Sequence, residues 1–180
     1  MVHYVDVAPT LIEAAGGAPV EGLDGRSFLR VLQGKTDRHN GVTYGVHTQK
    51  GAIGSPESGY PIRSIRAGRY KYIMNLNHAV TFNSALIKRD TEQYWSSWVE
   101  KANSDPHAKK LVQRYLHRPS EEFYDLEQDP HELNNLAADP RHRSRMNAMQ
   151  GQLQAWMESQ GDRGIETELS YQRKGKKKKR

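Results

Sequence analysis

A chain of 180 residues, 36% hydrophobic and 27% charged, is long enough for one domain or two small ones. It contains no cysteine, which excludes disulfides, cysteine-ligated metal centres and cysteine nucleophiles, and no apolar run approaches the roughly 20 residues that span a bilayer. Residues 173–180 hold seven of the 27 basic residues, so the rest carries 20 basic against 21 acidic residues. We therefore expect a solvated basic tail and no specific nucleic-acid partner, and the first residues predict no secretory signal.

Three elements are predicted in the first 60 residues. Asp6 is typical of a helix N-cap and Gly16 of a helix end, so the apolar residues between them predict a helix. A second, short helix should follow Ser27 as its N-cap. The β-branched and aromatic run at residues 42–47 (VTYGVH) predicts a strand that leads into a glycine-rich loop.

The clearest hairpin of the chain comes next. Residues 62–66 and 69–76 flank a turn at 67–68, and aromatic and apolar residues alternate with polar ones along the second arm. The following segment carries an aromatic patch at 94–98 and predicts a helix over 106–117.

The last third predicts a strand and a long helix. A strand at 123–126 should end in a turn at 129–132, and Asp139 followed by proline is typical of a helix start. The apolar residues of this helix recur at helical spacing, which indicates core packing in preference to a ligand groove. They are Met146, Met149, Leu153, Trp156 and Met157.

These elements do not make a balanced domain. The strand at 42–47 lies between helices in the sequence, and no neighbouring strand for it is evident in this chain. We therefore expect a piece of a larger protein. The first helix and this strand should expose apolar surface, which would leave the isolated chain marginally stable or self-associating.

No complete catalytic centre is visible. The histidines are scattered without partners at metal-ligand spacing, and nucleophile-elbow, phosphate-loop and H-E-x-x-H motifs are absent, so neither catalytic residues nor a metal site is expected. His47 stands out because it lies where a strand enters a glycine-rich loop, with Gln49 and Lys50 beside it. Loops at strand ends often hold ligands, although an ordinary surface histidine is the alternative.

Several segments together resemble the type I, formylglycine-dependent sulfatases. The strings stand in the family's order at residues 5–11 (VDVAPTL), 23–28 (LDGRSF), 63–72 (RSIRAGRYKY), 122–126 (EFYDL) and 129–132 (DPHE). Residues 60–64 (YPIRS) and 75–77 (NLN) are similar to the heparan N-sulfatase branch, also called N-sulfoglucosamine sulfohydrolases.

The resemblance implies an α/β, alkaline-phosphatase-like fold of which this chain is a C-terminal fragment. Residues 1–59 would then end the catalytic α/β domain. Residues 60–162 would form a small antiparallel subdomain closed by a C-terminal helix, and residues 163–180 a flexible basic tail. Sulfatases of this family are usually secreted, periplasmic or lysosomal.

The resemblance also implies that the reacting groups lie elsewhere. The family makes its formylglycine from Cys or Ser in C/S-x-P-x-R and binds a divalent metal, calcium, through acids upstream of the matched region. Here the x-P-x-R spacing recurs at residues 59–63, but Gly59 at the nucleophile position has no side chain to oxidise. The chain is thus expected to bind no cofactor itself and to be inactive alone.

The same resemblance places part of the chain at the rim of the substrate pocket. His47, Gln49, Lys50 and Arg63 are donors or cations suited to a sulfated sugar. Arg63 could equally pair with a nearby acid in the hairpin. The expected partners are the missing N-terminal catalytic portion and a sulfated glycan, with no membrane. The alternative is a standalone polyanion-binding module that uses the basic tail and the loop at 48–60.

Overall fold

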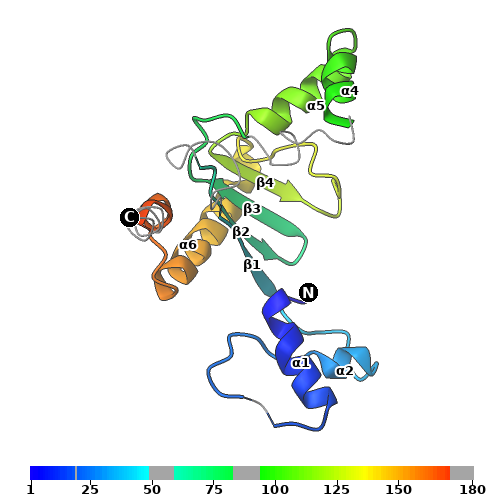
Figure 1. Ribbon diagram of the computed structural model, residues 1–180, viewed down its shortest axis with the longest axis vertical. Coiled ribbons are helices and arrows are strands. Elements are labelled where there is room, and N and C mark those ends of the chain that lie inside the picture. Colours follow the sequence, from blue (N-terminus) through cyan, green and yellow to red (C-terminus); the bar gives the residue numbers. More distant parts are fainter. Residues whose placement is uncertain (19, 49–58, 83–93, 171–180) are drawn as a thin grey trace, which may run out of the picture.

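The computed structural model describes all residues except 19, 49–58, 83–93 and 171–180. At its centre is a four-stranded antiparallel sheet in the order β1-β2-β3-β4 (Figure 1). The strands are β1 (Val42–His47), β2 (Ile62–Ala67), β3 (Tyr70–Asn75) and β4 (Glu121–Asp125). The helices are η1 (Tyr4–Asp6), α1 (Val7–Ala14), α2 (Leu29–Leu32), α4 (Tyr94–Ala102), α5 (Pro106–Leu116), η2 (Pro140–His142) and α6 (Arg143–Ser159).

The predicted hairpin is confirmed, with its turn displaced by one residue. β2 and β3 pair antiparallel from Ile62 opposite Asn75 to Ala67 opposite Tyr70. Gly68 has φ 57°, a left-handed conformation that glycine adopts without the steric cost of a Cβ. The tight turn therefore fixes the register of the two strands on which the rest of the sheet is built.

The strand at 42–47 does have a neighbour in this chain, which corrects the expectation from the sequence. β1 pairs antiparallel with β2, from Val42 opposite Ala67 to His47 opposite Ile62. The two strands are joined by a long connection, and such pairing leaves no local signature in the sequence. The expected domain boundary after residue 59 stays a prediction, although this pairing crosses it.

The predicted core of the C-terminal helix is confirmed. α6 lies along one face of the sheet (Figure 1) and buries its apolar side against Ile65, Tyr72 and Phe123, which are all fully buried. These three residues share a face because they are register partners in neighbouring strands. The buried residues of α6 are Met146, Met149, Leu153 and Met157.

The opposite face of the sheet carries polar side chains near α5. Glu122 and Tyr124 alternate with Phe123 along β4, so they point away from α6. Both are buried, and they meet Arg118 and Arg114 from the end of α5. α5 was predicted and starts as expected: Asp105 caps it by accepting hydrogen bonds from two backbone N–H groups of its first turn.

The N-terminal helices form a separate unit beyond β1 (Figure 1). α1 keeps its apolar face largely in solvent, with Leu11 64% exposed, as expected from the sequence. Asp6 occupies the N-cap position of α1, but its carboxylate does not cap that helix. Across the part of the chain that the structure describes, no helix combines the length and apolar character that a membrane crossing needs.

Candidate functional site

Two of the residues predicted to meet a substrate, His47 and Arg63, lie at one end of the sheet. β1 ends there at His47, β2 begins there at Ile62, β3 ends at Asn75 and β4 begins at Glu121. We refer to this edge as the His47 end of the sheet. Long connections leave it after β1 and β3, as in many folds where loops on a rigid scaffold carry the ligand-binding groups.

His47 is an exposed residue in a cationic environment. Its backbone oxygen accepts a hydrogen bond from Arg63 Nη1 at 3.3 Å, and its ring centroid lies 6.2 Å from that of Phe82. Partial desolvation and the positive charges of Arg118 and Arg63 lower the pKa of His47, against the opposing charge of Glu168. At neutral pH the ring is therefore uncharged and can donate or accept one hydrogen bond.

Replacing Arg118 with glutamine should raise the pKa of His47, because it removes a positive charge that opposes protonation of the ring. An NMR titration of the histidine ring protons measures this directly. In the unmodified chain we expect a pKa below the ordinary 6.5. The Arg66→Gln variant, which changes an exposed arginine, should leave the value unchanged. A His47 pKa of 6.5 or above that is the same in the wild type and in Arg118→Gln would contradict the cationic environment described for His47.

Arg63 is buried in ion pairs and 2% exposed. Its Nε donates to Asp162 at 2.5 Å and its Nη2 donates to Glu168 at 2.8 Å. Burial alone would lower the pKa of Arg63, but the two carboxylates raise it above the ordinary value. Arg63 is thus paired with acids, as in the alternative to substrate contact, but these acids lie far from the hairpin in the sequence and are not the nearby acid that was expected.

The other predicted rim residues, Gln49 and Lys50, lie outside the described residues. His47 and Arg63 are brought together by the β1–β2 pairing, in which Val46 faces Arg63. A role in substrate binding stays a prediction for all four residues.

Arg118 belongs to this end of the sheet, and sequence reasoning missed it. Its Nε donates to Glu122 Oε1 at 2.8 Å, and its guanidinium carbon lies 5.8 Å from the ring centroid of Phe82. Tyr60 donates from its hydroxyl to the Arg118 carbonyl oxygen at 3.4 Å. No local pattern signalled this pair, because i,i+4 pairing is a property of helices, whereas Arg118 follows α5 and Glu122 lies in β4.

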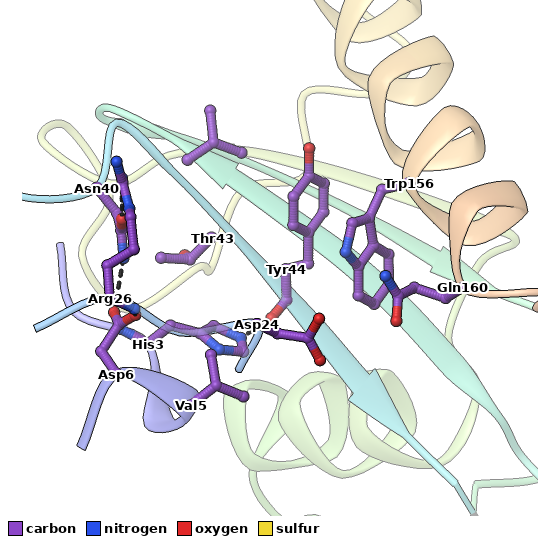
Figure 2. A pocket seen from close by; sticks show the side chains of 11 residues that line it. His3, Val5, Asp6, Asp24, Arg26, Asn40, Thr43, Tyr44, Trp156 and Gln160 are labelled. Carbon is purple, nitrogen blue, oxygen red and sulfur yellow. Dashed lines mark hydrogen bonds between the residues drawn. The ribbon is translucent and has the colours of Figure 1, made fainter. Parts of the chain in front are cut away.

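A second candidate is a cavity of about 410 Å³ between the N-terminal unit and the sheet (Figure 2). Its aromatic wall is formed by Tyr44 and Trp156, whose rings stack with centroids 4.6 Å apart. Its polar wall comes from the N-terminal unit, and Figure 2 shows His3, Asp6 and Arg26 on that side. The volume falls in the range of small-molecule pockets. Whether the cavity can bind a ligand therefore depends on whether its polar groups already have hydrogen-bond partners.

The central polar groups of this cavity already satisfy one another. Asp6 is 2% exposed and accepts hydrogen bonds from the backbone N–H groups of His3 (2.8 Å) and Arg26 (2.9 Å) and from the Asn40 amide (2.6 Å). Burial would raise the pKa of Asp6, but the two backbone hydrogen bonds and the contact with His39 lower it. We therefore interpret these polar groups as structural: the hydrogen bonds to Asp6 hold the segments of the N-terminal unit together.

The described residues do not fit the metal that the sequence resemblance implies. Among them, no group of three or more His, Asp or Glu side chains is placed to hold an ion. The x-P-x-R string at Gly59 also leads into β2, and Arg63 within it is engaged by Asp162 and Glu168.

Comparison with known proteins places this arrangement in context. No family model matches the chain. It is 37% identical over 162 residues to an ulvan-active sulfatase of Formosa agariphila, an alignment that spans 90% of this chain and 30% of the relative. It is 25% identical over 183 residues to the human N-sulphoglucosamine sulphohydrolase, spanning 86% of this chain and 32% of that protein.

The fold is also shared with solved structures. A 2-O GAG sulfatase superposes with a TM-score of 0.56 and 22% identity over 87% of this chain and 25% of the other. The chain therefore spans less than a third of the length of each of these three proteins. The likeness to this structure concerns the fold, in which a four-stranded antiparallel sheet packs against α6.

Proposed function

We propose, on the premise that the chain is a homologue of the sulfatases and corresponds to their C-terminal part, that it belongs to an enzyme that removes sulfate groups from an acidic glycan. In this proposal the chain supplies part of the substrate rim at the His47 end of the sheet. The nucleophile and the metal would come from the catalytic portion that the relatives contain and that this chain does not match.

The observation that carries the proposal is the alignment with the ulvan-active sulfatase at 37% identity over 90% of the chain. The geometry supports it. The His47 end brings cationic and hydrogen-bonding groups of several elements together, and these suit the negatively charged oxygens of a sulfated sugar. His47 comes from β1, and Arg118 follows α5.

The reaction is the hydrolysis of a sulfate ester, or of an N-sulfate, to an alcohol or amine and sulfate. A divalent metal and a formylglycine would supply the charge stabilisation and the nucleophile in the complete enzyme. The residues of this chain would bind the sugar and orient it. The strings at 60–64 and 75–77 support an N-sulfated substrate, and the relative named N-sulphoglucosamine sulphohydrolase is in keeping with that choice.

A chimera tests the proposal. The segment of the ulvan-active sulfatase that aligns with this chain is exchanged for this chain, and hydrolysis is assayed on sulfated ulvan oligosaccharides and on N-sulfoglucosamine. We expect turnover by the chimera and none by the isolated chain, because the reacting groups lie outside it.

The parent sulfatase is the positive control, and the chimera must show a cooperative unfolding transition before its activity is judged. A folded chimera that turns over neither substrate would contradict the proposal. So would turnover by the isolated chain.

A further inference from the structure

A cavity of about 240 Å³ lies beside the end of α5 and shares no lining residue with the cavity of Figure 2. Two arginines, one carboxylate and two apolar side chains line it, so its walls carry a net charge of +1. These residues are Leu111, Arg114, Tyr115, Arg118 and Glu122. An excess positive charge in a partly enclosed space favours an anion.

The single carboxylate of this cavity is already fully engaged. Glu122 is 4% exposed. It accepts hydrogen bonds from Arg118 Nε at 2.8 Å, from the Asn75 amide at 2.7 Å and from the Tyr124 hydroxyl at 2.5 Å. Burial would raise the pKa of Glu122, but these partners lower it. Glu122 is therefore ionised and neutralises Arg118. Arg114 forms no such close pair among the described residues; its charge acts on Asp129 only at longer range, where it helps to lower the pKa of that carboxyl.

Arg114 is a half-buried cation with almost no partners. Its Nη2 donates to the Tyr124 hydroxyl at 3.4 Å, and its guanidinium carbon lies 5.9 Å from the centre of that ring. Within the described part of the chain, no carboxylate forms an ion pair with Arg114. A guanidinium has five N–H donors, so most of those on Arg114 remain available.

We propose that this cavity binds a singly charged sulfate group, with Arg114 as its principal ligand and the Nη groups of Arg118 as the second. The charge of such a group matches the net +1 of the walls, and guanidinium groups are well suited to oxyanions. The group would be carried by a larger molecule such as a sugar, with Tyr115 and Leu111 forming the wall against its carrier, because a free sulfate ion carries a second negative charge that these walls do not balance. The site is argued from these contacts alone, so it does not depend on the proposed hydrolysis.

Binding can be measured on the isolated chain without any turnover. Methyl sulfate and sodium sulfate are titrated at constant ionic strength, with chloride as the balancing anion, and amide NMR shifts are followed. We expect saturable shifts at Arg114 and Tyr115. Arg114→Gln should weaken binding at least tenfold, because a charge-assisted hydrogen bond is lost. Arg66→Gln, the matched loss of an exposed arginine, should leave the affinity unchanged.

The two sulfate compounds differ in charge. Tighter binding of methyl sulfate, which is singly charged, supports the proposed site, and binding of sodium sulfate alone would contradict it. Arg114→Gln breaks no ion pair and should fold, and Arg114→Lys, which keeps the charge, should bind with intermediate affinity. Equal affinity in the wild type and Arg114→Gln, or shifts no larger than chloride produces, would overturn the proposal.

Discussion

Replacing Arg63 with leucine should lower the free energy of unfolding by about 3–5 kcal/mol, the usual cost of breaking a buried ion pair by removing one partner. Arg63 is 2% exposed and forms ion pairs with both Asp162 and Glu168. The leucine would leave these two carboxylates without their cation. It would also weaken the attachment of residues 162–170 to β2, because both ion pairs of Arg63 are made with that segment. Urea unfolding at pH 7 measures the change.

The dependence on pH provides a second check. Burial would raise the pKa of Asp162, but its bonds from Arg63 lower it below the ordinary 3.8. Its contribution to stability is thus present above pH 3.8 and is lost as the pH falls through the lower, folded-state pKa. The difference between wild type and Arg63→Leu should therefore shrink in acid.

The control for this prediction is Arg66→Gln, which should change stability by less than about 0.5 kcal/mol because the residue is exposed. A loss below about 1 kcal/mol in Arg63→Leu at pH 7 would show that the ion pairs of Arg63 with Asp162 and Glu168 do not stabilise the fold. The Arg63 side chain would then be free to meet another ligand.

Local patterns predicted the parts of this fold that are built from local contacts. The hairpin of β2 and β3 followed from its turn and its alternation, and the buried stripe of α6 followed from its spacing. α4 was not predicted as a helix, because its aromatic and serine residues are poor helix formers and only an aromatic patch was evident.

The remaining features depend on contacts between distant parts of the chain. The pairing of β1 with β2 spans a long connection, and Arg63 meets Asp162 from the other end of the chain. The spacing of apolar residues along the sequence does not indicate contacts between residues so far apart. The same limit applies to Asp6, which looked like a helix cap and instead holds Arg26 and Asn40.

For the candidate site, the sequence predicted where the strand ends but not which arginines lie near that end. The sequence indicated the end of the strand at His47, and the structure confirms that a strand ends there at the sheet edge. It did not indicate Arg114 or Arg118, because a helix with scattered arginines resembles any solvated helix until its position beside Glu122 and Tyr124 is known.

Replacing Lys50 with alanine in the sulfatase chimera should lower kcat/KM about ten- to a hundredfold. The reason is that a charge-assisted hydrogen bond to a bound anion contributes roughly 1.5–3 kcal/mol. Arg63 cannot serve for this test, since its loss would disturb the fold through Asp162 and Glu168. Lys50 can serve, because it is a cation three residues after His47 in the sequence and is predicted to meet the substrate.

Two controls make the result specific. Lys35→Ala removes an exposed lysine just after α2, and deletion of residues 173–180 removes seven cations of the tail. Neither should change turnover of a monosaccharide substrate, because Lys35 follows α2 and the tail is not among the residues predicted to meet the substrate.

The most direct measurement of the central claim is kcat/KM of the chimera for N-sulfoglucosamine or a sulfated ulvan oligosaccharide, compared among wild type, His47→Ala, Lys50→Ala and the tail deletion. A substrate rim at the His47 end predicts that the two point variants lose activity at unchanged thermal stability, while the tail deletion keeps it. Full activity in both point variants together with a loss in the tail deletion would contradict that placement, and would favour a polyanion-binding role for the basic tail.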